Sequence, residues 1–307
     1  MNPTTTFVTL LRREFWEHRA LWAAPLGVAL LIVVLTLLSG GLAGSPVQIQ
    51  VNGREADFIL RMSGPDQQKF FGVVVAGLMV PQLLVSMIVL FTYLLDSLYG
   101  ERKDRSILFW KSLPVSDAMT VASKATMALL VVPLLVYVVS VVVSLLIFVV
   151  LNFKFGGTPF APLVAWHTGD WLVLQGVLLL NVLVAALWYS PVVAALLVVS
   201  AAARRATVLW AVLPPLGLAL LERSMLGTRH VADFLGYRLT GFFDAMGVGF
   251  GREPGADVEA QARHVAMLYD RINAAPLLAN VDLWLGVAAA VALLAVAVRL
   301  RRWRDDT

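Results

Sequence analysis

The chain has 307 residues, of which 59% are hydrophobic and 14% charged, and its mean hydropathy is +0.81. Soluble domains carry about 45–50% apolar and about 25% charged residues, so this composition excludes an ordinary soluble domain. The formal net charge is +4, and basic residues cluster beside apolar runs as topology signals, which argues against nucleic acid as a partner. Because there is no cysteine, disulfides, zinc–thiolate sites and cysteine nucleophiles are excluded.

The N-terminal segment predicts an amphipathic helix. Apolar residues recur at helical spacing over residues 5–19, and charged residues lie between them. Trp16 and Trp22 flank the start of the first apolar run, so we expect residues 1–19 to form a helix along the membrane interface. That first run is longer than the core of a signal peptide and is expected to remain uncleaved.

Six apolar runs predict six membrane-spanning helices, since a helix needs about 20 residues to cross a bilayer core. The expected spans are residues 21–38, 70–95, 125–151, 171–203, 206–222 and 283–298. The fourth run is longer than a bilayer is thick, so that helix must tilt, kink or project. The fifth is short and contains Pro214 and Pro215, and Pro81, Pro133 and Pro191 are expected to kink three other spans.

Lysine and arginine are distributed unequally between the two sides that these spans define. Fourteen lie in short segments on the side of both termini, and ten are spread over longer loops on the other side. Because short basic segments stay in the cytoplasm, we expect both termini and the segment 96–124 to be cytoplasmic. The prediction is therefore a single all-α, polytopic domain over residues 1–307.

The two larger loops on the opposite side are predicted to be extracytoplasmic. In residues 40–69, the Asn52–Gly53 pair follows alternating apolar residues and predicts a short hairpin. The loop at 223–280 is an extended helical segment between spans 5 and 6. Its apolar stripe over 231–246 predicts an amphipathic helix with Arg238 off the stripe, and a second helix is expected over 257–272.

The segment between the second and third spans is densely charged but also carries large apolar residues. Seven acidic or basic residues lie between Asp96 and Lys111, with Ile107, Phe109 and Trp110 among them. This mixture is typical of a surface that docks another protein. The alternative is a solvated loop that Trp110 anchors at the lipid headgroups.

No motif in the sequence indicates an enzyme. There is no GxxxxGK[ST] phosphate loop, no HExxH or GxSxG motif, and no carboxylate cluster with metal-site spacing. The four histidines, His18, His167, His230 and His264, are isolated in sequence. We therefore expect no catalytic residue, no metal site and no cofactor bound by this chain.

Residues 101–124 also follow an ordered pattern. Glu101-Arg-Lys-Asp-Arg-Ser106 is followed by Ile-Leu-Phe-Trp-Lys-Ser-Leu, then by Pro114-Val115-Ser116, and finally by Lys124. This order resembles the signature of the type-2 ATP-binding-cassette (ABC) exporter permeases, in which a Glu-containing segment, a short helix and an apolar-Pro-Val-Ser pattern precede span 3. The usual Gly-Thr is replaced by Arg105-Ser106, where Ser can still cap a helix. The six-span layout is similar to that family as well.

The resemblance implies a permease subunit of an exporter in the bacterial cytoplasmic (inner) membrane. A separate ABC ATPase subunit would hold ATP and Mg and would dock on a coupling helix over 106–113. A second permease copy, in a homodimer, and membrane lipid are the other implied partners. The implied docking residues are Glu101, Arg102, Asp104, Arg105, Ser106, Ile107, Leu108, Phe109, Trp110, Lys111 and Leu113.

A few polar residues in the spans are candidates for a transport pathway. They are Gln82, Ser86, Gln175, Asn181 and Glu222. Neutral polar residues at this depth most often hydrogen-bond between helices, and contact with a substrate is the alternative.

Two other functions stay open. A membrane-embedded sensor or scaffold would use the same docking helix while residues 223–280 bind a ligand. An ion-coupled secondary carrier needs intramembrane carboxylates, for which Glu222 and Asp282 near span ends are the candidates. No lining of one charge stands out in the spans, so lipid, peptide and hydrophobic small molecule all stay open as substrates.

Overall fold

The computed structural model describes residues 3–38, 50–51, 54–55, 64–104, 115–156, 167–245, 269 and 271–303. Six helical stretches in these ranges are long and apolar enough to cross a membrane, which confirms the predicted multi-pass helical fold. The predicted hairpin is confirmed too, because β1 (Gln50–Val51) pairs antiparallel with β2 (Arg54–Glu55). The second outer helix, predicted over 257–272, lies almost entirely outside the described residues.

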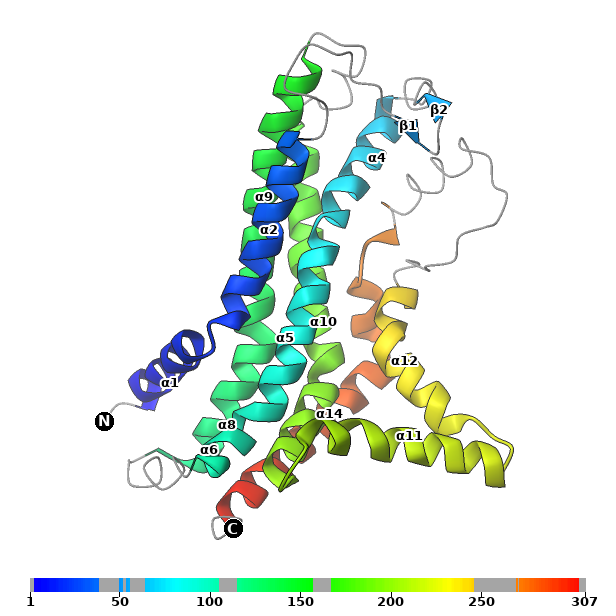
Figure 1. The fold of residues 1–307 in the computed structure, drawn as a ribbon. Coiled ribbons are helices and arrows are strands. Elements are labelled where there is room, and N and C mark those ends of the chain that lie inside the picture. The colour runs from blue at the N-terminus through cyan, green and yellow to red at the C-terminus, as the bar shows by residue number, and fades with distance from the viewer. Residues whose placement is uncertain are drawn as a thin grey trace.

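The N-terminal helix α1 (Pro3–Glu17) lies beside one end of the bundle, and its direction differs from that of α2 (Ala20–Leu38), as Figure 1 shows. Its inner face carries Leu10 and also Glu14, which is 1% exposed. Val8 and Trp16 are exposed on other faces. The predicted amphipathic helix is therefore present, but a buried carboxylate lies on its apolar side.

The second span is divided into three helices, α4 (Gly64–Gly77), α5 (Met79–Ser97) and α6 (Tyr99–Lys103). The first break, at Leu78, comes just before Pro81. Proline has no amide donor and its ring crowds the carbonyl group four residues earlier, which here belongs to Gly77. Pro81 is therefore expected to interrupt the helix about one turn before itself, which is where α4 ends and α5 begins.

The third span begins with α8 (Asp117–Thr126), passes through a π-helical turn, η1 (Met127–Val131), and continues as α9 (Val132–Phe155). Ser116 caps α8, since its hydroxyl accepts a hydrogen bond from the amide of Met119 at 3.2 Å. The π-helical turn η1 ends two residues before Pro133. In a regular α-helix the ring of Pro133 would crowd the carbonyl group of residue 129, and the wider turn avoids this contact.

Helix α10 (Thr168–Ala202) is the central element of the bundle. Its 35 residues give a length of about 52 Å, well over the ~30 Å of a bilayer core, and it continues through Pro191 without a break. It packs along α14 (Val281–Trp303) and also contacts α5 and α9. The main buried core joins α2, α5, α8, η1, α10 and α14 through residues such as Leu21, Leu94, Val121, Met127, Leu197 and Ala297.

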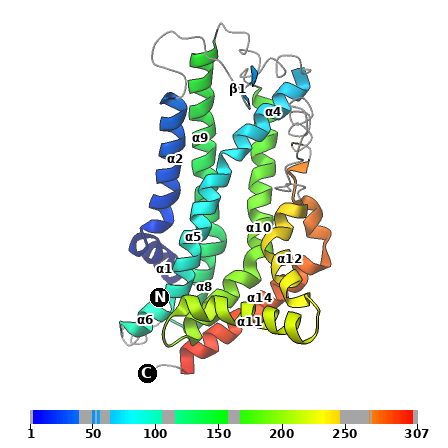
Figure 2. The ribbon, with the colours of Figure 1, turned by 45° about the vertical axis from the view of Figure 1, so that its right-hand side comes forward.

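Helix α11 (Thr207–Met225) is one of the six apolar helices, but it lies across the end of the bundle rather than along α10 (Figures 1 and 2). None of its residues is buried against the rest of the chain that the structure describes. The change of direction after α10 occurs at Ala206, which adopts the left-handed conformation with φ 49°. An L-residue other than glycine pays about 1–2 kcal/mol for that conformation.

Helix α12 (His230–Ala245) is the predicted amphipathic helix, and it buries Arg238, which lies off the predicted apolar stripe, together with Phe242 of that stripe. Arg238 is 8% exposed and Phe242 is 5% exposed, whereas Phe234 and Leu239 of the apolar stripe are 60% and 52% exposed. The guanidinium of Arg238 lies 5.1 Å from the centre of the Trp188 ring and donates to the backbone carbonyl of Asp282 at 2.6 Å. These two partners on α10 and α14 make an inward-facing arginine favourable.

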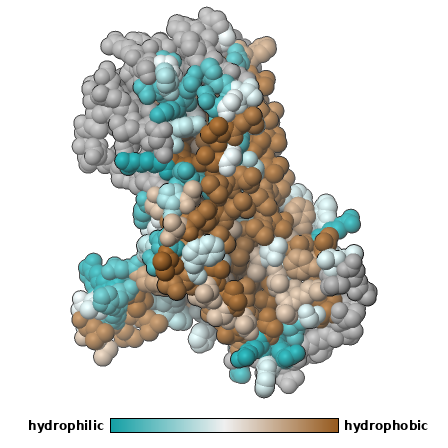
Figure 3. Space-filling view, turned by 180° about the vertical axis from the view of Figure 1, so that it is seen from behind, coloured by the Kyte–Doolittle hydropathy of each residue, from teal (hydrophilic) through white to brown (hydrophobic). Residues whose placement is uncertain are grey.

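The outer surface of the bundle is strongly apolar. Figure 3 shows a continuous hydrophobic surface along its middle. Exposed large apolar side chains occur on every long helix, including Leu30, Ile88, Val138, Val173 and Val291. Such a surface is unfavourable in water and suits contact with lipid.

Candidate functional site

A buried network of charged side chains lies at the end of the bundle where α6 ends and α8 begins. Its five members are Glu14 of α1, Glu101 of α6, Asp117 and Lys124 of α8, and Arg301 of α14. They come from four helices, and more than 100 residues separate most of the partners in sequence. This network therefore joins the first, second, third and last long segments of the chain.

Lys124 forms the centre of one half of the network. Its ammonium nitrogen Nζ lies 2.8 Å from Oε1 of Glu14 and 3.1 Å from Oε1 of Glu101. Both Lys124 and Glu14 are 1% exposed, and Glu101 is 7% exposed. Charges so far from water are tolerated only when they are paired, because the loss of hydration costs several kcal/mol per ion.

Arg301 forms the other half. Its Nη1 donates to Oε2 of Glu101, and its Nε donates to Oδ1 of Asp117 at 3.0 Å. The Glu101 carboxylate therefore bridges the two cations, with one oxygen toward Lys124 and the other toward Arg301. Because Asp117 lies in the first turn of α8, its negative charge also suits the positive end of that helix.

The second carboxylate oxygen of Glu14, Oε2, is contacted by a side chain of α5 and by His18, which follows α1. The Tyr93 hydroxyl donates to Oε2 of Glu14 at 2.9 Å, and the ring of His18 packs edge-on against the Tyr93 ring. Nε2 of His18 lies 3.6 Å from the same carboxylate oxygen. Three carboxylates thus share two permanent cations, with a tyrosine and a histidine at the edge of the network.

Residues next to Glu101 connect the same region to α10. The guanidinium of Arg102 donates to the backbone carbonyls of Ser200 at 2.6 Å and Ala203 at 2.9 Å. The Ser200 hydroxyl donates to the carbonyl of Leu95 and accepts from the amides of Leu98 and Tyr99 at the break between α5 and α6. The end of span 2 is therefore held to α10 by backbone groups as well as by charge.

The residues predicted for ATPase docking separate into three groups. Glu101 and Arg102 point into the bundle, as described above, and Asp104 is exposed at the end of α6. The other eight, from Arg105 to Leu113, lie outside the described residues. The described network lies on both sides of that segment, at Glu101 before it and at Asp117 after it.

Four predicted pathway residues are buried inside the bundle, each less than 9% exposed: Gln82, Ser86, Gln175 and Asn181. Gln82 donates to the Leu78 carbonyl at the break in span 2, and Ser86 donates to the Gln82 carbonyl. Asn181 instead links separate segments, because its carbonyl oxygen accepts from the amide of Ala274 at 2.8 Å.

The fifth predicted pathway residue, Glu222, lies near the end of α11. Its carboxylate accepts hydrogen bonds from the Thr228 hydroxyl at 2.6 Å and from the amides of His230 at 2.8 Å and Val231 at 2.7 Å. These amides belong to the first turn of α12, whose N-terminal donors have no partner within the helix. Glu222 therefore caps α12 from the neighbouring helix.

Asp282, the other carboxylate considered for ion coupling, is exposed at the start of α14. It accepts a hydrogen bond from the Tyr237 hydroxyl at 3.0 Å. Partial burial, together with this hydrogen bond, raises the pKa of Tyr237 above its ordinary value. The phenol therefore stays protonated at neutral pH and remains a donor to Asp282.

Sequence reasoning found Glu101 and Lys124 but missed the other three members of the network, Glu14, Asp117 and Arg301, and also Tyr93 at its edge. One signal was present for Glu14, which follows Leu10 by four residues and therefore shares its inward face. For the others the partners are distant in sequence, so no local pattern identifies them.

Comparison with protein-family models, with curated proteins and with solved structures gives no match to this chain. The arguments about its function therefore come from the fold and from the buried network. In the part of the chain that it describes, the structure shows six helices long and apolar enough to cross a membrane and an extensive buried charge network at one end of the bundle.

Proposed function

We propose that this chain is the permease subunit of an ABC-type exporter, and that a separate ATPase subunit docks on the helix expected over residues 106–113. The supporting observation is the position of the buried network. Glu101 and Asp117 lie on the two sides of the 105–114 segment, and both bond to Arg301. A displacement of that segment would therefore act on α14 directly and on α1 through Lys124 and Glu14.

Under this proposal, Glu101 and Arg102 act within the permease rather than at the docking surface. Their side chains hold the end of span 2 to α8, α14 and α10. The docking contacts fall to the exposed Asp104 and to the apolar and charged residues from Arg105 to Leu113. ATP and Mg would be bound by the partner, and a second copy of this chain would complete the exporter.

The helix interruptions provide places where such a displacement changes the bundle. Span 2 breaks at Leu78, and span 3 contains the π-helical turn η1 at Met127–Val131. Interruptions of this kind absorb changes of helix direction more easily than continuous α-helix. The segments near the network would then move relative to α4 and α9 when the ATPase subunits close.

The first step is to look for an ABC ATPase among the neighbouring genes, and the test then uses this chain purified together with that ATPase. Trp110→Ala and Ile107→Asp should reduce co-purification of the ATPase and the fraction of ATP turnover that drives export, with membrane insertion unchanged. Trp303→Ala is the matched control, because Trp303 is 81% exposed near the same end of the bundle. If both variants retain the ATPase and transport as the control does, the docking assignment is wrong.

The same experiment separates the exporter from the sensor alternative. A sensor or scaffold subunit would keep the ATPase contact without moving a cargo across reconstituted vesicles. An ion-coupled carrier would transport with no ATPase present and would respond to an imposed ion gradient.

A further inference from the structure

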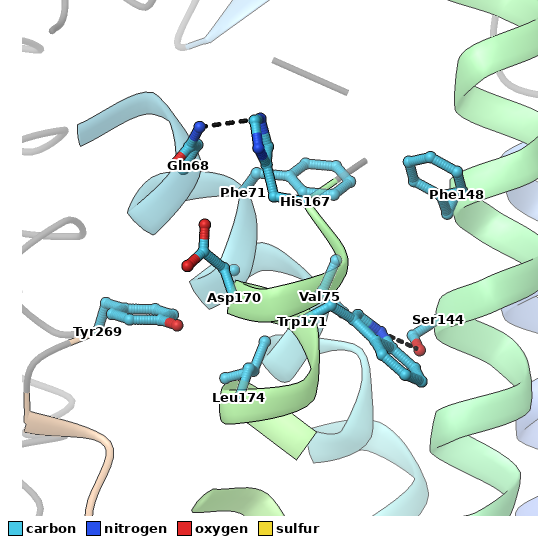
Figure 4. Close-up of a pocket in the computed structure, with 11 residues that line it drawn as sticks. Gln68, Phe71, Val75, Ser144, Phe148, His167, Asp170, Trp171, Leu174 and Tyr269 are labelled. Carbon is cyan, nitrogen blue, oxygen red and sulfur yellow. Dashed lines mark hydrogen bonds between the residues drawn. The ribbon is translucent and has the colours of Figure 1, made fainter. Parts of the chain in front are cut away.

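A small pocket lies at the end of the bundle opposite the charge network, between α4, α9 and α10 (Figures 1 and 4). Its aromatic lining comes from several elements: Phe71 from α4, Phe148 from α9, Trp171 from α10, and Tyr269 from the chain before η3 (Ala275–Ala279). In Figure 4 Asp170 lies on the same side of α10 as Tyr269, whereas the Trp171 ring points to the other side, toward Ser144. The pocket therefore combines aromatic rings with a single negative charge.

The charge in this pocket is not neutralised within the described part of the chain. Among the described lining residues, Asp170 is the one acidic residue, and there is no lysine or arginine. No hydrogen bond or ion pair joins Asp170 to another described residue, and it is exposed to solvent at the pocket. An anionic ligand would be repelled here, whereas a cation would find both a carboxylate and aromatic rings.

Two of the rings are held in place by hydrogen bonds. Nε1 of Trp171 donates to the Ser144 hydroxyl at 3.4 Å, and the amide nitrogen of Gln68 lies 2.9 Å from Nε2 of His167. These two contacts join the start of α10 to α9 and to α4.

We propose that this pocket binds a small organic ammonium group, through Asp170 and through cation–π contact with the aromatic rings that line the pocket. Aromatic lining is the usual means by which proteins recognise alkylammonium ions. The cavity volume of about 60 Å³ is enough for a small head group, whereas pockets for drug-sized molecules are about 300–1,000 Å³. The rest of a larger ligand would remain outside, as solvent-exposed chain or as the tail of a lipid.

The ammonium group can come from a soluble amine or from a lipid headgroup, and the experiment distinguishes them. The full chain is placed in nanodiscs of phosphatidylglycerol, and binding of radiolabelled choline is measured by equilibrium dialysis against empty discs. Tetramethylammonium should displace the label, and the neutral isostere 3,3-dimethyl-1-butanol should not. If addition of phosphatidylethanolamine to the discs also displaces choline, the ligand is a headgroup; if it does not, the ligand is soluble.

Two variants test the lining directly. Asp170→Asn and Trp171→Leu should each weaken choline binding by about twofold to fivefold, since a single cation–π or surface charge contact is worth about 0.5–1 kcal/mol. Asp233→Asn, on the exposed side of α12, is the control and should leave binding unchanged.

A glycine pair offers a test that removes no lining side chain. A Cβ at Gly72 would lie 2.7 Å from the Tyr269 ring, whereas a Cβ at Gly77 meets nothing within 4 Å. Both residues are in α4, so alanine favours the helix at either position. Gly72→Ala should weaken choline binding and Gly77→Ala should not. Absence of specific choline binding, equal binding of the neutral isostere, or equal effects of the two alanine variants would overturn the proposal, and none of these results depends on the ATPase.

Discussion

Two glutamates on α1, one buried in the network and one exposed, test how much the buried ion pairs contribute to stability. Glu14→Gln removes a carboxylate charge that is 1% exposed and lies 2.8 Å from the ammonium group of Lys124. Glu17→Gln makes the same chemical change three residues later, where the side chain is 49% exposed and pairs with Arg13 within the helix. The two variants therefore differ in burial and partner but not in chemistry.

The expected magnitudes differ about tenfold. Breaking a buried ion pair costs about 3–5 kcal/mol, and we expect the lower end, about 3 kcal/mol, because Lys124 keeps Glu101 at 3.1 Å. An exposed pair four residues apart on a helix contributes about 0.3–0.5 kcal/mol. The measurement is the free energy of unfolding in mixed micelles, followed by circular dichroism over a denaturing detergent series. Equal destabilisation by the two variants would refute the reasoning.

A double variant separates the network's contribution to stability from its role in transmitting motion from the 105–114 segment. Replacing a buried ion pair with apolar residues of similar volume is often neutral or stabilising, but Lys124 also pairs with Glu101, so Glu14→Met with Lys124→Met should recover part of the stability that Glu14→Gln loses, with Glu101 still paired to Arg301. If the network transmits motion from the 105–114 segment, ATP turnover in this double variant should remain uncoupled from export. Normal coupled export by that protein would assign the Glu14–Lys124 pair a structural role alone.

The remaining predictions concern the backbone around α10. Ser200→Ala should cost about 1–3 kcal/mol, because the buried Ser200 hydroxyl bonds three backbone groups at the break between α5 and α6, and Ser224→Ala on the exposed α11 should change stability by less than about 0.5 kcal/mol. Ala206→Gly should stabilise the chain by about 1 kcal/mol by relieving a left-handed conformation, whereas Ala211→Gly inside α11 should destabilise it by about 0.5–1 kcal/mol. The free energy of unfolding of all four variants is measured by the same detergent denaturation. A larger loss for Ser224→Ala than for Ser200→Ala, or for Ala206→Gly than for Ala211→Gly, would contradict the argument.

The apolar helices were predictable because hydrophobic run length is a local property. The first span was predicted over 21–38 and is observed over Ala20–Leu38, and the last was predicted over 283–298 within Val281–Trp303. The proline positions also indicated where spans 2 and 3 depart from regular helix. The direction of α11 across the end of the bundle could not be predicted from composition. It depends on contacts with α5, α10 and α12 rather than on the residues of α11 alone.

The charged and polar contacts were much harder to predict, since their partners are far apart in sequence. Amphipathic patterning assigns charged residues to the solvent face, yet Glu14 and Arg238 both face inward. Each does so because a partner from another helix lies there, Lys124 for the first and Trp188 with Asp282 for the second. The network could be anticipated only in part, through Glu101 and Lys124 in the charged segment between spans 2 and 3.

The composition of the network has a consequence for the order of assembly. Arg301 is synthesised after every other member, because α14 follows α1, α6 and α8 in the chain. Until it arrives, Glu14, Glu101 and Asp117 have Lys124 as the one permanent cation that the described contacts provide. The base of the bundle therefore closes only when α14 inserts, and a nascent chain lacking it presents excess buried negative charge.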